Sequence, residues 1–309
     1  SSPNLLIKEY TLLFFSIVAM NFGFAQHWVQ LGAGNGFMEA SDLVVDVDGK
    51  TLATGYFTST ANFGAFSETS YGNSDVFVCQ IDENGSYQWL LTFGGIGTDR
   101  GNSIATDNVG NSYVTGFFND SIQIGSFELV SEGAQDVFIA KISPTGTVLW
   151  ANKLGGLQAD IGTTIAQLSN GNIVVSGQFS GLVNFGSFGI QSINNSIDVF
   201  VIVLDSLDGS MVWSKTGGSK FDDTAVSVAC DGLGNMNLTG MFSDTIKFDV
   251  LHPNTSNNNV YLIQFNATGT ENWFRRIAGS TFVGVHALEC TSSGNVYLTG
   301  DYIGTLSFF

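Results

Sequence analysis

The chain has 309 residues, of which 44% are hydrophobic and 12% charged, and its formal net charge is −17. This hydrophobic fraction excludes a disordered protein, and the acidic excess, 27 Asp and Glu against 10 Lys and Arg, argues against nucleic acid or an anionic membrane as a partner. Gly is abundant, with 38 residues against only 3 Pro, and it indicates many tight turns between short strands.

The N-terminal residues 1–25 have the pattern of a secretory signal peptide. Lys8 precedes an apolar run from Thr11 to Met20, and Ala25 offers a small residue for cleavage. The run is too short to cross a bilayer as a helix. We therefore expect an exported bacterial protein, secreted or displayed at the cell surface, whose mature part is residues 26–309 and contains no membrane span.

The rest of the chain repeats with a period of about 61 residues, and four series of residues share it. The tryptophans are Trp28, Trp89, Trp150, Trp213 and Trp273. A glycine series in TGYF-like motifs is Gly55, Gly116, Gly177, Gly240 and Gly300. A third series precedes each of these glycines by six residues, and a fourth precedes Trp by four. The spacing between repeats varies slightly along the chain, and it varies in the same way in all four series. The common period is therefore not a chance pattern.

One period predicts four strands. In the second copy they are Ser103–Asp107, Ser112–Phe118, Asp136–Ile142 and Thr147–Lys153. A longer polar loop, 119–135, separates the second from the third, and its counterparts are 58–74, 180–197 and 243–258. No helical periodicity is present in the mature chain.

The third strands indicate how these units pack. DVFVCQI, DVFIAKI, DVFVIVL and NVYLIQF are nearly continuous apolar runs, so both of their faces must be covered. Four-stranded antiparallel units of constant length with two covered faces are what propeller blades require. We therefore predict an all-β fold, a β-propeller, in preference to a sandwich or a solenoid.

The motifs GNSYVTGFF, DVFIAKISPTGTVLW and LGGxxxD resemble the SBBP-type bacterial β-propeller repeat. The resemblance covers residues 28–302 and rests on several fixed offsets. It implies an exported propeller, usually of uncharacterised or binding function, and it supplies no catalytic residues.

Four full blades are expected, at about 41–92, 103–153, 164–216 and 225–276. A fifth begins with His286–Cys290 and Val296–Tyr302, and Trp28–Leu31 is the fourth strand of a further blade. This strand is a candidate clasp for the last blade. We expect the repeat domain, residues 26–309, to be truncated at its C-terminal end.

Two repeated series are candidates for structural or functional roles. We assign the tryptophans to the core between blades, because each aromatic side chain buries about 150–250 Å². The variable loops are the better candidates for ligand contact. Their apolar residues in repeat register are expected to anchor them, namely Phe63, Ile124, Phe185, Phe248 and Phe308.

Asp99, Asp160 and Asp223 recur between the fourth strand of one blade and the first strand of the next. One carboxylate per blade would form a ring near the channel mouth, a candidate Ca²⁺ site. The alternative is that each side chain accepts hydrogen bonds from turn N–H groups.

Other motifs carry less information. Asp46-Val-Asp48-Gly49 resembles the opening of a Ca²⁺ loop but lacks its Glu, so a hairpin turn is expected; Gly32-Ala-Gly34-Asn-Gly36 is a blade connection. His27, His252 and His286 occupy unrelated repeat positions, so a histidine metal cluster is not expected. Acidic pairs such as Asp222–Asp223 are too common in this acidic chain to identify a glycosidase. The cysteines, Cys79, Cys230 and Cys290, are odd in number and expected to be free and buried.

No G-x-S-x-G motif and no non-repeating acid/base constellation is present, so we predict no catalytic and no cofactor-binding residue. The favoured function is a non-catalytic binding scaffold for carbohydrate or protein on one propeller face. The alternatives are an enzyme acting on extracellular polysaccharide and a structural segment of a larger surface protein.

Overall fold

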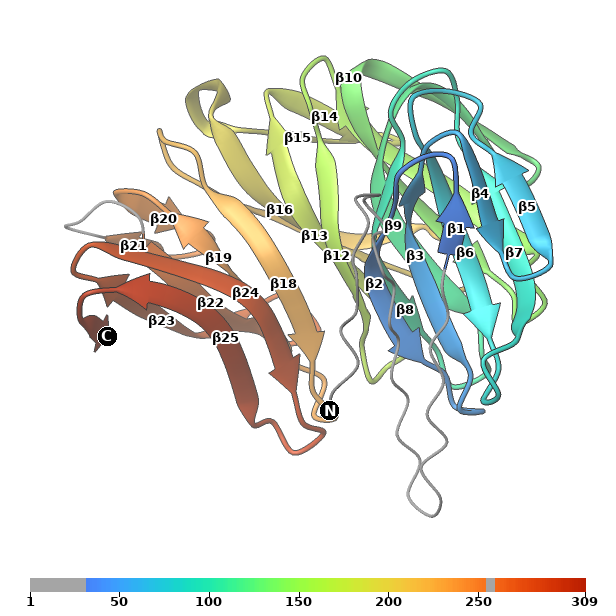
Figure 1. The fold of residues 1–309 in the computed structure, drawn as a ribbon. Helices are drawn as coiled ribbons and strands as arrows, with labels where there is room; N and C mark the ends of the chain where they lie inside the picture. Colours follow the sequence, from blue (N-terminus) through green and yellow to red (C-terminus); the bar gives the residue numbers. More distant parts are fainter. Residues whose placement is uncertain (1–31, 254–258) are drawn as a thin grey trace, which may run out of the picture.

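The computed structural model describes residues 32–253 and 259–309, so the predicted signal peptide and the Trp28 strand lie outside it. These residues fold almost entirely into β-strands (Figure 1), with one short 3-10 turn at Ile193–Asn195. The predicted all-β fold is confirmed. In these two ranges, no helix has the length and hydropathy needed to span a membrane.

Four antiparallel sheets follow one another along the chain, each with its four strands in chain order, and we call them blades 1 to 4. Blade 1 consists of β2 (Met38–Val45), β3 (Thr51–Phe57), β6 (Asp75–Ile81) and β7 (Tyr87–Phe93). Blade 2 consists of β8 (Arg100–Thr106), β9 (Ser112–Ile124), β10 (Phe127–Ile142) and β11 (Val148–Gly156). Blade 3 consists of β12 (Ile161–Gln167), β13 (Ile173–Ser180), β16 (Ile197–Leu204) and β17 (Met211–Gly217). Blade 4 consists of β18 (Thr224–Cys230), β19 (Met236–Phe242), β22 (Asn259–Phe265) and β23 (Glu271–Gly279).

Blade 5 contains β24 (Phe282–Cys290) and β25 (Val296–Ile303), which form a separate two-stranded sheet. The blades stand side by side in an arc (Figure 1), and the first strand of each lies against the first strand of the next, from β2 to β24. The prediction of four full blades and one partial blade is confirmed. Several strands are longer than predicted, as β9 and β10 show.

The long segments predicted as polar loops are β-hairpins. They comprise β4 (Thr60–Phe63) with β5 (Phe66–Thr69), β14 (Leu182–Phe185) with β15 (Phe188–Gln191), β20 (Thr245–Lys247) with β21 (Leu251–Pro253), and in blade 2 the outer halves of β9 and β10. Sequence alternation in these segments is interrupted by Ser, Asn and Gly, so the strand signal is weak.

These hairpins join neighbouring blades. β14 of blade 3 pairs with the end of β11 in blade 2, and Gly218 of blade 3 bridges to Lys247 in the blade 4 hairpin. β1 (Gly32–Gly34) pairs with β4 in the same way, and β26 (Leu306–Phe308) with β23. Gly156 is required at such a crossing, because a Cβ there would collide with the carbonyl oxygen of Leu182.

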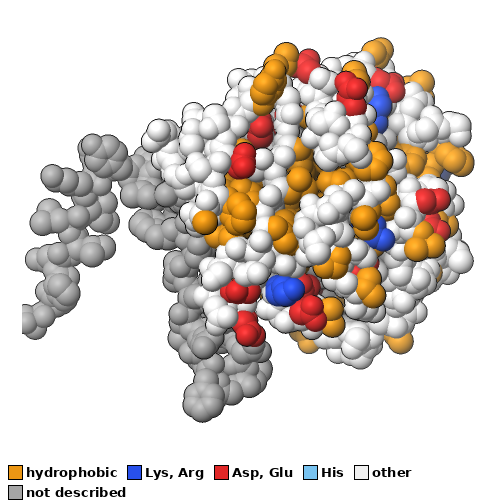
Figure 2. Space-filling model, turned by 90° about the vertical axis from the view of Figure 1, so that its right-hand side faces the viewer, with side chains coloured by type: hydrophobic (Ala, Val, Ile, Leu, Met, Phe, Trp, Pro, Cys, Tyr) orange, Lys and Arg blue, Asp and Glu red, His pale blue; other side chains and the backbone are white. Residues whose placement is uncertain are grey.

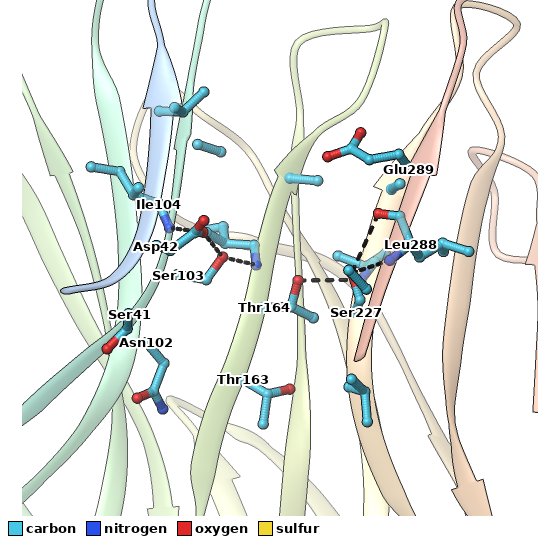
Figure 3. A pocket seen from close by; sticks show the side chains of 18 of the residues that line it. Ser41, Asp42, Asn102, Ser103, Ile104, Thr163, Thr164, Ser227, Leu288 and Glu289 are labelled. Carbon is cyan, nitrogen blue, oxygen red and sulfur yellow. Dashed lines mark hydrogen bonds between the residues drawn. The ribbon is translucent and has the colours of Figure 1, made fainter. Parts of the chain in front are cut away.

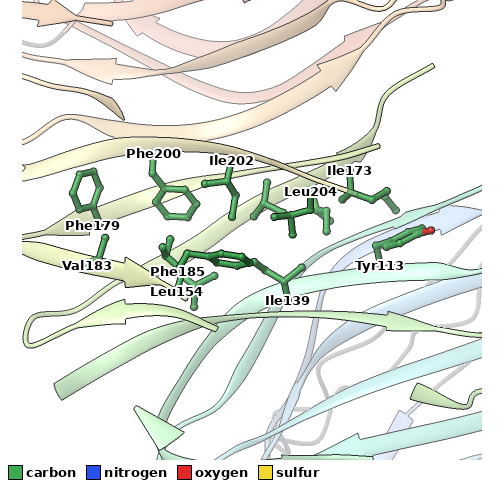
Figure 4. Packing of buried hydrophobic residues seen from close by; sticks show 14 of the residues in the cluster. Tyr113, Ile139, Leu154, Ile173, Phe179, Val183, Phe185, Phe200, Ile202 and Leu204 are labelled. Carbon is green, nitrogen blue, oxygen red and sulfur yellow. The ribbon is translucent and has the colours of Figure 1, made fainter. Parts of the chain in front are cut away.

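The core lies between blades rather than within them. Phe200, Ile202 and Leu204 of β16 pack against Val137 and Ile139 of β10, all nearly or fully buried (Figure 4). Burial of apolar surface contributes roughly 25 cal/mol per Å². The third strands are therefore the main source of cohesion between blades, as their unbroken apolar sequences predict.

The tryptophans also act between blades, as predicted. The Nε1–H of Trp89 donates to the carbonyl of Pro144, and the Nε1–H of Trp150 to that of Ser206, each in the turn before the fourth strand of the next blade. A Cβ at Gly209 in that turn would lie 3.0 Å from the Trp150 ring. The glycine series four residues before Trp thus leaves room for the tryptophan of the preceding blade.

Apolar side chains are also present on the surface. Figure 2 shows the side of the molecule that carries β4, β5 and β7, where hydrophobic side chains lie among polar atoms and acidic groups. Single exposed apolar residues are normal on a protein surface, so this view alone does not identify a binding site.

Candidate functional site

The first strands of the five blades surround a cavity of about 590 Å³, which we call the central channel (Figure 3). Its lining comes from β2, β8, β12, β18 and β24. Cavities of about 300–1,000 Å³ with a few well-placed polar groups are typical of binding sites for small ligands. The channel is therefore the candidate site.

Each first strand has a β-bulge at the same repeat position. The pairing register shifts at Ser41 in β2, Asn102 in β8 and Thr163 in β12, and at the equivalent Val226 and His286 in β18 and β24. A bulge places two successive residues opposite one partner and redirects their side chains. Ser41, Asn102 and Thr163 consequently line the channel.

In blades 1 to 4, the side chain of the residue after the bulge accepts a hydrogen bond from the next blade. Ser103 Oγ accepts from the N–H of Ile165 at 3.3 Å, and Thr164 Oγ1 accepts from the N–H of Val228 at 3.2 Å. We call this series the hydroxyl ladder; its members are Asp42, Ser103, Thr164 and Ser227 (Figure 3). It fixes the spacing of the first strands and hence the width of the channel.

The ladder differs at its two ends. Asp42 accepts from both the N–H of Ile104 at 2.9 Å and the hydroxyl of Ser103 at 2.7 Å, and its other oxygen accepts from the N–H of Leu43. In blade 5 the equivalent residue is Ala287, which has no side-chain acceptor. Burial raises the pKa of Asp42, and the three hydrogen bonds oppose that rise.

The series Asp99, Asp160 and Asp223 lies elsewhere. All three side chains are fully buried at the junctions between blades, and none lines the channel. Burial raises their pKa values, to about 6 for Asp99 and about 7 for Asp160 and Asp223. No group of three or more His, Cys, Asp or Glu side chains within 32–253 and 259–309 is placed to hold a metal ion.

The hydrogen bonds of these carboxylates follow the alternative interpretation. Asp160 accepts from the N–H of Gly156 at 2.9 Å and from the N–H of Ser180 at 3.2 Å, so it joins the blade junction to the hairpin. Asp99 accepts from Gly95 and Asn119 in the same pattern. Ca²⁺ binding by these residues stays a prediction, which titration calorimetry with Ca²⁺ and with EDTA tests.

The weaker motifs are turns and connections. Asp46 accepts from the N–H groups of Asp48 and Lys50, as expected of a hairpin turn. Gly34 lies in β1, which pairs with the blade 1 hairpin, as expected of a blade connection. In the acidic pair, Asp222 accepts from the N–H of Ile197 and Asp223 from that of Ser243.

The histidines and cysteines are dispersed. His252 Nε2 lies 2.8 Å from Glu271, and His286 Nε2 lies 3.2 Å from Asp301 at the channel end of blade 5; His27 is outside the described residues. The three cysteines are free thiols; Cys79 is buried, whereas Cys230 and Cys290 are partly exposed, so the expectation that these two are buried is wrong. Burial raises the pKa of Cys79 to about 12 and that of Cys290 to about 11.

The predicted hairpin anchors are buried in blades 1 to 4, at Phe63, Ile124, Phe185 and Phe248. Phe308 is 72% exposed, so its assignment as an anchor is wrong in this structure. The reason is its environment, because β26 forms no hairpin with a following strand among the described residues.

The hydroxyl ladder is the feature that the sequence interpretation missed. Its signal is present, because Asp42, Ser103, Thr164 and Ser227 each precede the TGYF-type glycine by 13 residues. Small polar residues at this position have the same period as the tryptophans. Their role depends on a bulge, which the residue pattern alone does not reveal.

Comparison with known proteins agrees with this architecture. Residues 88–116 match the family model of the SBBP beta-propeller repeat. An uncharacterized WD repeat-containing protein of Acanthamoeba polyphaga mimivirus is 25% identical over 198 residues, which are 54% of this chain and 14% of that protein. The chain thus spans about one seventh of that relative's length.

Among solved structures, a protein of unknown function from Bacteroides caccae is similar to 77% of this chain over 81% of its own length, at 12% identity and a TM-score of 0.36. The matched segment 88–116 runs from β7 through the Asp99 junction and β8 into β9. Residues 88–116 therefore match the SBBP β-propeller repeat that the motifs predict, and they lie within the array of four-stranded blades.

Proposed function

We propose that the chain is an exported, non-catalytic binding scaffold whose central channel takes a carbohydrate ligand. The observation that carries the proposal is the channel lining. Ser41, Asn102 and Thr163 bring two hydroxyls and an amide to one cavity of about 590 Å³. Asn102 Nδ2 donates to the carbonyl of Gly162 at 2.8 Å, and Thr163 Oγ1 donates to that of Ser176 at 3.1 Å. Their side-chain oxygens and the Ser41 hydroxyl can accept hydrogen bonds from the hydroxyl groups of a sugar.

The distribution of charge supports binding over catalysis. The titratable groups that line the channel include Asp42, His286 and Glu289. Asp42 is fully engaged in the hydroxyl ladder, and His286 pairs with Asp301. Glycoside cleavage needs two carboxyl groups that face a common substrate. Asp42 and Glu289 both line the channel, but Asp42 is held by hydrogen bonds from Leu43, Ser103 and Ile104.

A glycan array followed by calorimetry tests the proposal. We expect saturable binding without product release, and we expect Ser41→Trp to abolish it by filling the channel. Ser67→Trp on the exposed strand β5 is the matched control and leaves binding unchanged. Product release would support the polysaccharide-acting enzyme instead, and absence of both would support a structural segment of a larger surface protein.

A protein ligand is the second candidate, and exposed apolar residues favour it. Each connection into blades 1 to 4 exposes one large apolar side chain, namely Phe37, Ile96, Leu157 and Phe221, and the first residue of β24 in blade 5, Phe282, is also exposed. The antiparallel order of strands puts these connections at one end of the blades. A variant with both Ile96→Glu and Leu157→Glu tests this candidate. If it loses binding while Ser41→Trp retains binding, the ligand contacts this end of the blades.

The proposal of export rests on residues 1–25. Fusion of this segment to a reporter enzyme that is active only outside the cytoplasm tests it, with Leu12→Arg and Phe14→Arg in the apolar run as the control. We expect activity from the unaltered segment and loss of activity in the control.

A further inference from the structure

A second cavity, of about 390 Å³, lies between blades 4 and 5. Its walls are largely apolar, and they come from β22 and β23 on one side and from β24 to β26 on the other. The apolar lining residues include Val260, Leu262, Ile277, Leu298 and Leu306. We call this cavity the blade 5 groove. It is separate from the central channel, which has no lining residue in common with it.

The complete blades show what occupies the equivalent place. Between blades 3 and 4, Val199 and Val201 of β16 belong to one core cluster with Tyr261 and Ile263 of β22. The third strand of one blade therefore packs on the third strand of the next. Repeat register makes Val260 and Leu262 the equivalents of Val199 and Val201, and these two residues form part of the groove wall.

Exposure supports this correspondence. The third strands of blades 1 to 3 are buried at every residue from the aspartate onward, whereas Leu262 in blade 4 is partly exposed. In blade 5, the residues Thr299 to Tyr302 are exposed, although the equivalent residues Thr115 to Phe118 of β9 are buried. The groove thus has the shape of a third-strand position that the described residues do not fill.

The edge of β25 fits the same occupant. In blades 2 to 4 the second strand pairs with a third strand, placing Gly116 opposite Phe138 and Gly177 opposite Phe200. A Cβ at Gly116 would lie 2.9 Å from the Phe138 ring, and a Cβ at Gly177 would lie 2.7 Å from the Phe200 ring. Gly300 is the equivalent glycine of β25, and no described strand pairs with that edge.

We propose that β25 and the blade 5 groove bind an extended polypeptide strand of the repeat's own third-strand type, Asp-x-Phe-x-Ile-x-Leu, by β-strand addition. The partner strand pairs antiparallel with β25 and sets its aromatic third residue over Gly300. Its third, fifth and seventh side chains fill the groove against Val260 and Leu262. The partner is therefore a polypeptide that carries this apolar alternation, and main-chain hydrogen bonds supply the rest of the affinity.

The test uses a labelled peptide with the sequence of residues 197–217, which form β16, its turn and β17. We expect saturable binding at one site, and slower amide hydrogen exchange in β25 when the peptide is bound. The same peptide with Phe200→Ala should bind at least about tenfold more weakly, since a tenfold change corresponds to 1.4 kcal/mol.

Variants of the protein locate the site. Tyr302 is equivalent to Phe118, which pairs with Asp136 of β10. Tyr302→Pro removes a backbone N–H at the open edge and should abolish binding, whereas Tyr302→Ala keeps that N–H and should retain it. Leu262→Glu on the groove wall should also abolish peptide binding, independently of the edge of β25. Unchanged circular dichroism shows that each variant is folded.

Three results would overturn the proposal: absence of saturable binding, equal binding of the Phe200→Ala peptide, or exchange protection confined to elements other than β25. Binding that survives both Tyr302→Pro and Leu262→Glu would also overturn it.

Discussion

At the scale of single residues, the repeat combines pairs of positions that act across a blade boundary. Trp150 is 6% exposed and contacts the turn of the next blade through both its ring and its Nε1–H. Gly209 lies beneath that ring with a φ of +74°. One contact therefore requires both the tryptophan and the glycine, although the two residues belong to different repeats.

Trp150→Ala should lower the free energy of unfolding by about 3–5 kcal/mol, the usual cost of removing a buried large aromatic side chain. Trp150→Phe should cost less, because it keeps part of the ring contact and loses the hydrogen bond to Ser206. Chemical denaturation of the two variants measures this order. An unchanged unfolding curve for the alanine variant would contradict the role in the core.

Gly209→Ala should be more destabilising than Gly171→Ala. Both glycines have a positive φ, which costs a side chain about 1–2 kcal/mol. A Cβ at Gly171 meets no atom within 4 Å, whereas a Cβ at Gly209 meets the Trp150 ring. A Cβ at Gly209 would also collide with Asn152 Nδ2. The difference between the two variants therefore reports contact with these two side chains of β11, and equal destabilisation would contradict it.

Asp160 makes the stability depend on pH. Its pKa in the folded protein is about 7 because burial disfavours the charged form, while an unfolded Asp has a pKa of about 3.9. The folded state thus binds the proton more tightly, so this contribution to stability is fully present below about pH 4 and is lost as the pH rises through 7.

We therefore expect Asp160→Asn to reduce the fall in melting temperature between pH 5 and pH 8. Glu128→Gln, at an exposed residue of β10 in the blade 2 hairpin, is the control and should leave that fall unchanged. Thermal unfolding at the two pH values measures both. A pH dependence identical to that of the unaltered protein would show that Asp160 does not carry it.

At the scale of elements, adjacent blades are held by two kinds of contact besides the apolar core. Hairpins such as β14–β15 pair with the outer strand of the preceding blade, and the hydroxyl ladder joins the first strands near the channel. The ladder matters for the candidate site because it sets the distance between the strands that line it.

Thr164→Val should destabilise the protein by about 1–3 kcal/mol, because it leaves the buried N–H of Val228 without its acceptor while keeping the side-chain shape. Thr164→Ser restores an acceptor and should recover most of the loss. Denaturation compares the two, and equal stability of the valine variant and the unaltered protein would contradict a role for the ladder.

The sequence predicts which residues form strands better than it predicts how those strands pair. The DVF runs and the TGYF glycines place the four strands of each blade, because apolar continuity and turn residues are local signals. The hairpins are not predicted, since their second strands, such as β15, expose most of their residues and lack alternation. The ladder depends on the bulges at Asn102 and Thr163, which arise only when strands pair.

At the scale of the whole molecule, each blade contacts mainly its neighbours, as in other repeat proteins, where stability is approximately a sum of unit and interface contributions. Blade 3 is covered on both faces, with β16 buried almost throughout. Blade 5 has one neighbouring blade among the described residues, and most of β25 is exposed. Stability should therefore decrease from the middle of the arc toward blade 5.

Native-state hydrogen exchange measures this gradient directly, because amides report the free energy of the smallest opening that exposes them. We expect the slowest exchange in β13 and β16 and the fastest in β25. The matched comparison is β19 of blade 4, whose residues are buried at nearly every position of the same strand type. Protection in β25 equal to that in β19 would mean that the blades open together, and that the exposed edge of blade 5 is not a separate, less stable unit.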